Sequence, residues 1–327
     1  MPVHVHYNCF EDYLAAIMRS LYAHKDVNKV MPVMDQGTHH KLKLMYDKYV
    51  YMLFVASAAL MAIIIFAIIL FIGQQGLLTF KEVSPLEFFF TAKWDPSDGL
   101  YGAVSFILGS LYATFLAVII GAPLGLAGAI FLAKIAPKRI RQFMRPATDL
   151  YVAVPSVVYG YIGLTILVPF IRVYFQAGSG FGLLAASLIL AVMILPTVIT
   201  ISEDAIRSVP STLEEASLAL GATRWQTIRR VLLPAAAPGI LTAIILAMAR
   251  AIGETMAVQM VIGNTPLLPK SLLTPTATLT SEIVVEMGNT PFGSTWGNSL
   301  FLLALVLLAV SLLMIICIRR IGKRRFA

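Results

Sequence analysis

Charged residues are scarce in this sequence. They make up 13% of its 327 residues, whereas 58% are hydrophobic. A soluble domain carries about a quarter charged residues, so the composition excludes an ordinary soluble enzyme. Cysteine is scarcer still, and Cys9 and Cys317 lie near opposite ends of the chain, which argues against a disulfide framework. The sequence also lacks a glycine-rich loop ending in Gly-Lys-Ser or Gly-Lys-Thr, so it shows no nucleotide site of its own.

Long apolar runs are present instead. Six of them reach the roughly 20 residues that a helix needs to cross a hydrocarbon core, and the alternating pattern of a membrane β-barrel is absent. We therefore predict an all-α integral membrane protein with six transmembrane helices, at residues 49–72, 104–133, 150–171, 183–203, 236–263 and 298–318. A kink or break is predicted in the second of these spans, which holds Gly121, Pro123, Gly125 and Gly128.

Lysine and arginine predict the orientation, because they gather on the cytoplasmic side of membrane proteins. With the N-terminus inside, 20 basic residues fall in the cytoplasmic segments and four in the outer ones. The cytoplasmic segments are then 1–48, 134–149, 204–235 and 319–325. We expect a multi-pass protein with both termini in the cytoplasm, a cytoplasmic tail over 1–48 and a membrane domain over 49–327. Membrane orientation accounts for the excess of basic residues. We therefore expect contact with membrane lipid and no binding to nucleic acid.

The N-terminal stretch holds all five histidines, and "HVHYNC" brings His4 and His6 near Cys9. Three candidate ligands without the paired spacing of a structural zinc site do not predict a metal site.

The segment 204–235 has the pattern of an ordered cytoplasmic loop. Pro210 stops one helix, and Ser211 or Thr212 is expected to cap the next, with Glu214 and Glu215 in its first turn. That short helix runs to Gly221, a residue suited to a left-handed helix end. A second amphipathic helix, "TRWQTIRRVLL", follows, and Pro234 is expected to turn the chain back into the membrane.

This loop resembles the coupling loop of ABC importer permeases, which reads E-A-A, three residues, G, nine residues, I-x-L-P. The matching residues here are Glu215-Ala216-Ser217, Gly221 and Val231-Leu232-Leu233-Pro234. The resemblance implies the type I importer permease fold and a loop that docks on a separate ATP-binding subunit through Glu215, Ala216, Gly221, Leu233 and Pro234. ATP would then be used by that partner, while this chain binds no cofactor and catalyses no bond cleavage.

The fifth span carries the only charges inside a long apolar run, Arg250 and Glu254 within "MARAIGETMAV". On a continuous helix they share one side with a stripe of small residues, Ala236, Gly239, Ala243, Ala247 and Ala257. Two interpretations stay open. The pair either neutralises itself at i,i+4 for structural reasons, or Arg250 meets an anion in transit, for which guanidinium geometry is suited. The second is favoured, because charge inside a membrane usually marks a transport path.

"PSVVYG", "MILPT" and "ARAIGETMAV…IGN" resemble the permeases of phosphate-specific ABC importers, most closely the PstC-type subunit. The resemblance implies a bacterial or archaeal inner membrane and Arg250 and Glu254 as residues of the phosphate path. It also implies the partners: a homologous PstA-type permease, two copies of an ATP-binding subunit and an external phosphate-binding protein. The alternatives are a permease for sulfate or molybdate and an ion-coupled secondary carrier.

Overall fold

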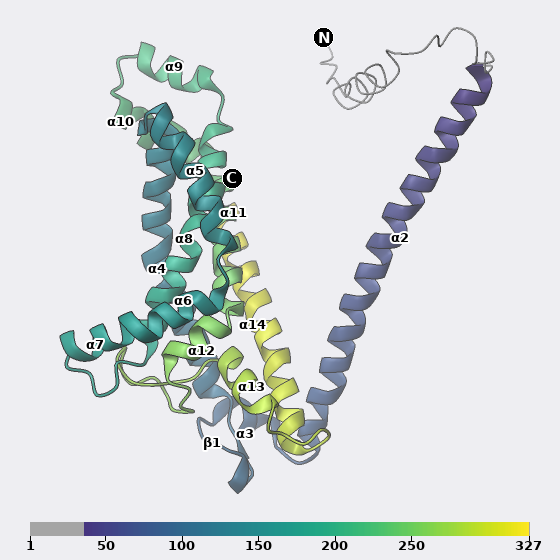
Figure 1. Ribbon diagram of the computed structural model, residues 1–327, viewed down its shortest axis with the longest axis vertical. Coiled ribbons are helices and arrows are strands. Elements are labelled where there is room, and N and C mark those ends of the chain that lie inside the picture. Colours follow the sequence, from purple (N-terminus) through teal and green to yellow (C-terminus); the bar gives the residue numbers. More distant parts are fainter. Residues whose placement is uncertain (1–35, 327) are drawn as a thin grey trace, which may run out of the picture. The chain divides into compact units, whose positions relative to one another are not determined.

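The computed structural model describes the backbone of residues 36–326 and the side chains of residues 48–320, and it is almost entirely helical (Figure 1). The helices are α2 (Gln36–Leu77), α3 (Pro85–Phe90), α4 (Val104–Ile130), α5 (Lys138–Ala153), α6 (Ser156–Ile162), α7 (Val168–Tyr174), α8 (Leu183–Arg207), α9 (Ser211–Ala219), α10 (Arg224–Thr227), α11 (Leu233–Gly253), α12 (Met256–Ile262), α13 (Leu279–Met287) and α14 (Thr295–Phe326). Single π-helical turns cover Phe131–Ile135, Gly163–Leu167 and Ile228–Leu232. Two-residue strands β1 (Trp94–Asp95) and β2 (Leu100–Tyr101) pair antiparallel.

The chain divides into two units, residues 1–67 and 68–327. In the first, the structure describes residues 36–67, all within α2. From Tyr51 onward the large apolar side chains of this segment, such as Phe54 and Ile64, are exposed all around the helix. A helix that is apolar on every side suits a hydrocarbon surrounding rather than water. The histidine-rich stretch lies outside the described residues.

Within the described part of the chain, six helices are long and apolar enough to cross a membrane, as predicted from the sequence. They cover Lys48–Lys81, Val104–Ile135, Ser156–Tyr174, Leu183–Arg207, Arg224–Gly253 and Thr295–Arg320. α2 begins at Gln36, so the last residues of the segment expected as a tail are helical.

The second span is not broken at these residues, so a break, one of the two predicted outcomes, is wrong. α4 runs without interruption through Pro123, which is exposed on its surface. The glycines serve packing instead: a Cβ atom on Gly121 would lie 2.8 Å from Ile194, and one on Gly125 would lie 2.7 Å from Val198. Small residues let two membrane helices approach closely, and this accounts for the intimate contact of α4 with α8.

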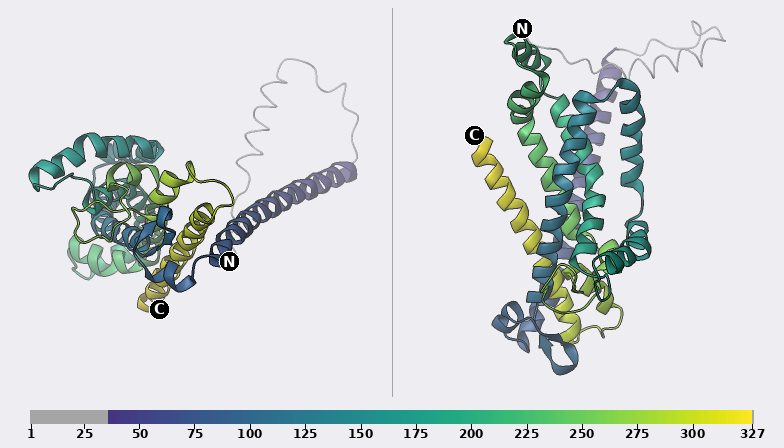
Figure 2. Two further views of the ribbon diagram at one scale, coloured as in Figure 1. Left: turned by 90° about the horizontal axis from the view of Figure 1, so that it is seen from below. Right: turned by 90° about the vertical axis from the view of Figure 1, so that its left-hand side faces the viewer.

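The segment 134–149, between the second and third predicted spans, is mostly the amphipathic helix α5. The third span begins at Ser156 rather than at residue 150. α5 packs on α8 and runs alongside it (Figures 1 and 2). The helix ends at Ala153 because Pro155 forces the residue before it, Val154, into an extended conformation. α5 buries none of its side chains fully, so its charged face and its apolar face are both presented outward.

Three hydrophobic clusters hold the second unit together. The largest joins α4, α6, α8, α11 and α12. A second joins α3, the β1–β2 hairpin, α13 and the adjoining ends of α4 and α14. The third joins the other end of α4 to the C-terminal end of α8 and the start of α11. α9 and α10 therefore lie at one end of this unit, and β1 and α13 lie at the opposite end (Figure 1).

The charge bias predicts that the α9 end faces the cytoplasm. Single cysteines in place of the exposed Ser208 and Ser271, in a chain without Cys9 and Cys317, test this. In intact cells an impermeant thiol reagent is expected to label position 271 and to leave position 208 unlabelled. Both positions should react once the membrane is opened, which serves as the control. Labelling of position 208 from outside would overturn the orientation.

Candidate functional site

Span five is broken next to the charged pair. α11 ends at Gly253, Glu254 has an extended backbone (φ −67°, ψ 131°), and α12 begins at Met256. The prediction of a continuous helix over 236–263 is therefore wrong. Arg250 and Glu254 are consequently not one helical turn apart on the same helix. Gly253 is a poor helix former, and the Glu254 side chain accepts the Ala257 N–H at 3.3 Å, which gives a new helix start a partner for one of its free donors.

Arg250 is half-buried and is held by a neutral group. Its Nη1 atom donates to the hydroxyl of Thr197 on α8 over 3.4 Å, a long and weak hydrogen bond. Within the described residues no ion pair joins it to Glu254 or to another acid. Its positive charge is thus not neutralised by a carboxylate, which leaves the guanidinium able to bind an anion.

Glu254 faces a different set of groups. Thr280 donates to its backbone carbonyl over 3.0 Å, and its side chain helps to line a small cavity of about 10 Å³. The other polar side chains around this cavity are hydroxyls, from Ser110, Thr114, Thr278 and Thr280. That volume holds about one water molecule. Glu254 therefore belongs to a hydroxyl-lined cluster between α4, α12 and the start of α13 rather than to an ion pair.

Most of the stripe of small residues on α11 is buried. Ala236, Ala243 and Ala247 are at most 4% exposed. A Cβ atom on Gly239 would lie 2.4 Å from the Cβ atom of Ala205, so α11 and α8 meet there almost backbone to backbone. The stripe sets the close packing of these two helices, and Arg250 reaches Thr197 from the same interface.

α6 fixes the position of the second half of the broken span. A Cβ atom on Gly160 would lie 2.9 Å from the Cα atom of Ala257, so α6 and α12 are in backbone contact. The Tyr159 hydroxyl also donates to the carbonyl of Tyr151 in α5 over 2.8 Å. The "PSVVYG" motif therefore anchors the helix that follows Glu254.

Sequence reasoning missed the hydroxyl groups of this site. Thr197 was part of the "MILPT" motif but gave no sign of its contact with Arg250, because a threonine in an apolar helix usually bonds its own backbone. The residues from Thr278 to Ser281 were expected to lie in an outer loop, yet Thr278 and Thr280 are buried against span five.

The predicted coupling loop, residues 204–235, forms two short helices that meet near Gly221, as expected. α9 ends at Ala219, and Gly221 has a φ of 80°, the left-handed conformation expected of it. The predicted Ser211 or Thr212 cap is wrong: Pro210 holds the N-cap position and makes no side-chain bond. The true capping box lies one helix later, at Thr223 and Gln226 of α10. Lys134 contacts Glu214 at 2.6 Å, which ties the loop to the end of α4.

Pro234 does not turn the chain as expected. The helix is continuous from Arg224 to Gly253, and a π turn over Ile228–Leu232 lies just before the proline. Proline cannot donate a hydrogen bond to the residue four positions earlier. The wider π turn shifts the hydrogen bonds by one residue, so that Leu233 bonds to Ile228, and the helix continues.

The residues assigned to coupling differ in exposure. Glu215, Ala216, Gly221 and Pro234 are exposed, whereas Leu233 is half-buried. Large apolar side chains are exposed beside them on α9 and α10, at Leu213, Leu218, Leu220 and Trp225. Leu220, the residue that follows α9, is 89% exposed. α9 lies at the end of the bundle farthest from α13 (Figure 1). Clustered apolar side chains on a polar tip are typical of a protein-binding surface.

A second acid is buried near the α13 end. Glu282 is 3% exposed, and this burial, with Glu286 one turn away, raises the pKa of its carboxyl to about 9. Glu286 in turn accepts hydrogen bonds from the indoles of Trp94 (3.1 Å) and Trp296 (2.7 Å). Burial therefore favours the protonated form of the Glu282 carboxyl.

Comparison with known proteins places this architecture. Residues 125–326 match the family described as the inner membrane component of binding-protein-dependent transport systems. The chain is 50% identical over 278 residues to the probable ABC transporter permease protein YqgH of Bacillus subtilis, a match that spans 84% of this chain and 90% of that protein. It is 34% identical over 282 residues to the phosphate transport system permease protein PstC of Mesorhizobium japonicum, spanning 79% and 85%.

Among solved structures, the fold is similar to that of a chain in a bacterial ABC transporter for the acidic polysaccharide alginate. The TM-score is 0.59 at 16% identity, over 88% of this chain and 99% of that chain. The six-span bundle therefore has the type I ABC importer permease fold. The chain belongs to the family of binding-protein-dependent transport system inner membrane components. Membership implies that it works with a substrate-binding protein and an ATPase.

Proposed function

We propose that this chain is one of two permease subunits of an ATP-driven phosphate importer and forms half of the path for the anion. The observation that carries the proposal is the half-buried Arg250. It stands inside a span, beside a helix break, and is bonded to a neutral hydroxyl instead of a carboxylate. A guanidinium offers paired N–H donors that match phosphate oxygens and keeps its charge at any physiological pH.

The break beside Arg250 supports a transport role. Non-helical backbone within membrane helices is tolerated where it is enclosed by protein or lines a cavity, and transporters bind substrates at such interruptions. Glu254 then weakens the positive potential at the arginine without occupying its hydrogen-bond donors, which allows an anion to bind and also to leave.

Coupling to ATP is assigned to α9 and α10. The exposed apolar tip around Leu220 and Trp225 is suited to a groove on an ATP-binding subunit, and Gly221 fixes the angle between the two helices. Two copies of that subunit would dock, one on this chain and one on a homologous PstA-type permease. A phosphate-binding protein would deliver the anion at the α13 end. ATP binding would open the path outward, and hydrolysis would reset it.

Phosphate is preferred over other oxyanions because relatives named as phosphate permeases PstC match most of the chain. Sulfate and molybdate share the tetrahedral shape, and charge does not separate them. An ion-coupled carrier is the second class, and the exposed coupling tip argues against it, since such a carrier docks no ATPase.

The test is anion uptake in cells that lack their own high-affinity phosphate importer and express this chain with its partner subunits. Uptake of radiolabelled phosphate is expected to be unaffected by excess sulfate or molybdate. It should be lost when the partner ATPase is inactivated, or when this chain alone is omitted. Inhibition by sulfate or molybdate would reassign the substrate, and uptake that follows the proton gradient without the ATPase would reassign the class.

A further inference from the structure

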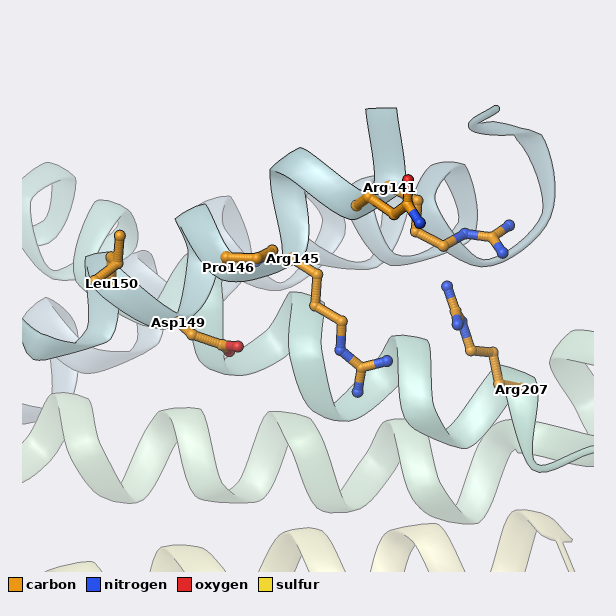
Figure 3. A pocket seen from close by; sticks show the side chains of 7 residues that line it. Arg141, Arg145, Pro146, Asp149, Leu150 and Arg207 are labelled. Carbon is orange, nitrogen blue, oxygen red and sulfur yellow. The ribbon is translucent and has the colours of Figure 1, made fainter. Parts of the chain in front are cut away.

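A groove between α5 and α8 lies at the end of the unit that carries the coupling loop. Its volume is about 690 Å³, within the usual range of small-molecule sites. The residues that line it are Arg141, Gln142, Arg145, Pro146, Asp149, Leu150 and Arg207 (Figure 3). Three guanidinium groups and one carboxylate, that of Asp149, therefore line a groove outside the site of Arg250, and the cations outnumber the acid.

Arg141 is the most available of these cations. Its Nε atom donates to the carbonyl of Leu132 over 3.0 Å, and its Nη2 atom donates to the carbonyl of Ala133 over 3.4 Å. Carbonyl oxygens orient the guanidinium without cancelling its charge. Its remaining donors stay free to meet an anion, which is the arrangement already seen for Arg250 and Thr197.

Arg145 and Arg207 are paired with acids of α8, but the pairs differ. Arg145 contacts Asp204 at 2.8 Å, and both side chains are about half exposed. Exposed pairs of this kind contribute little free energy and can be exchanged for another anion. Arg207 contacts the buried Glu203 and its Nε atom has no partner within the described residues. Arg207 points from α8 toward α5, and Arg145 points from α5 toward α8 (Figure 3).

The groove is aligned with Arg250 along α8. Thr197 and Asp204 are seven residues apart, so they lie on the same side of the helix, about 10 Å from each other. Arg250 contacts the first from α11, and Arg145 contacts the second from α5. Arg250 and Arg145 therefore contact the same side of α8, about two helical turns apart.

We propose that this groove is a second oxyanion site, which receives phosphate on the cytoplasmic side of the path after Arg250 and before release. The proposal rests on the proposed function for its substrate and direction. Arg141 and Arg145 supply the donors, Asp204 is displaced by the anion, and Arg207 with Glu203 closes the far side. Filling of this site from the cytoplasm would slow further import.

Membrane orientation is the competing explanation for these arginines. Lysine fulfils that role as well as arginine does, whereas only arginine offers a planar fork to an oxyanion. Arg141→Lys/Arg145→Lys separates the two, because it preserves charge and orientation and removes the fork. Arg139→Gln is the matched control, since Arg139 is an exposed cation of the same helix that does not line the groove.

The experiment measures binding of radiolabelled orthophosphate to the complete transporter in nanodiscs of phosphatidylcholine, without the external binding protein. All variants carry Arg250→Gln, so that the groove is measured alone. Binding is expected to persist in this background and with Arg139→Gln. It should weaken about tenfold or more with Arg141→Gln/Arg145→Gln, and to an intermediate degree with the double lysine variant.

Two results would overturn the proposal. One is phosphate binding that is absent from the Arg250→Gln background or indifferent to both groove arginines. The other is a result in nanodiscs of phosphatidylglycerol in which phosphate no longer binds and the transporter retains that lipid only when the groove arginines are present. This result would assign the groove to a lipid headgroup. Wild-type uptake measured in parallel keeps the two proposals apart. Failed uptake refutes the proposed function. Normal uptake, together with phosphate binding that Arg141→Gln/Arg145→Gln does not weaken, refutes only the proposal for the groove.

Discussion

Arg250→Gln is expected to lower phosphate uptake roughly 10- to 100-fold while the complex still assembles. The loss corresponds to a hydrogen bond with a charged group. Assembly should persist because the side chain has a single long bond, to a neutral hydroxyl, so its removal strands no charged partner. Glutamine retains polarity and most of the length, and the close packing of α11 on α8 by small residues is unchanged.

Three further variants separate a substrate contact from a structural ion pair. Arg250→Lys keeps the charge without the fork and should give intermediate uptake. Glu254→Gln keeps the size of the side chain and a carbonyl oxygen for the Ala257 N–H, so α12 should still form and only the field at Arg250 should change. Because the two residues make no ion pair, Arg250→Gln/Glu254→Gln should be as defective as Arg250→Gln alone.

Uptake of radiolabelled phosphate and the amount of purified complex are measured for all four variants. Arg172→Gln, which removes an exposed arginine at the end of α7, is the control for loss of a cation as such. Recovery of uptake in the double variant would show that the charges serve each other, and the substrate-contact assignment would fail. Reduced recovery of complex in Arg250→Gln would point to a structural role as well.

Features that depend on composition over many residues were predictable. Six apolar runs gave six spans because the length needed to cross a membrane is fixed by its thickness. The coupling loop was predictable because proline and glycine act locally: Gly221 takes its left-handed conformation irrespective of distant contacts. The cap at Thr223 was missed because the prediction assigned the N-cap of this loop to Ser211 or Thr212, directly after the helix-ending Pro210.

Features that depend on packing between helices were not predictable. Gly121 and Gly253 look alike in sequence, yet the first lies in an unbroken helix against Ile194 and the second ends a helix. The difference lies in the neighbours, since Glu254 and Thr280 supply bonds to the interrupted backbone. The hydrogen-bond partner of Arg250 was also unpredictable, because it lies on a neighbouring helix. A helical wheel assumes a continuous helix, and it assigned the arginine to Glu254 when its contact is Thr197 on another span.

Gly221→Val is expected to abolish transport while leaving membrane insertion intact. No atom lies within 4 Å of the position a Cβ atom would take, so size alone causes no clash. The penalty comes from the backbone, because φ is 80° and a side chain in that conformation costs about 1–2 kcal/mol, and more when it is β-branched. Relief of this strain would rotate α9 relative to α10 and move the exposed tip around Leu220.

Gly221→Asn and Gly221→Ala complete the series. Asparagine tolerates the left-handed conformation, so it should transport almost like the natural chain, and alanine should fall between asparagine and valine. The measurements are the amount of ATPase that copurifies with this chain and the ratio of ATP hydrolysed to phosphate moved. If strain at Gly221 misplaces the docking surface, the valine variant should retain less ATPase or hydrolyse more ATP per phosphate moved. The size of the effect should follow the energetic cost of a positive φ for each substituted residue. Normal transport by the valine variant would show that the likeness to the coupling motif is coincidental. If the asparagine variant lost as much transport as the valine variant, the glycine would matter for its small size rather than for its conformation.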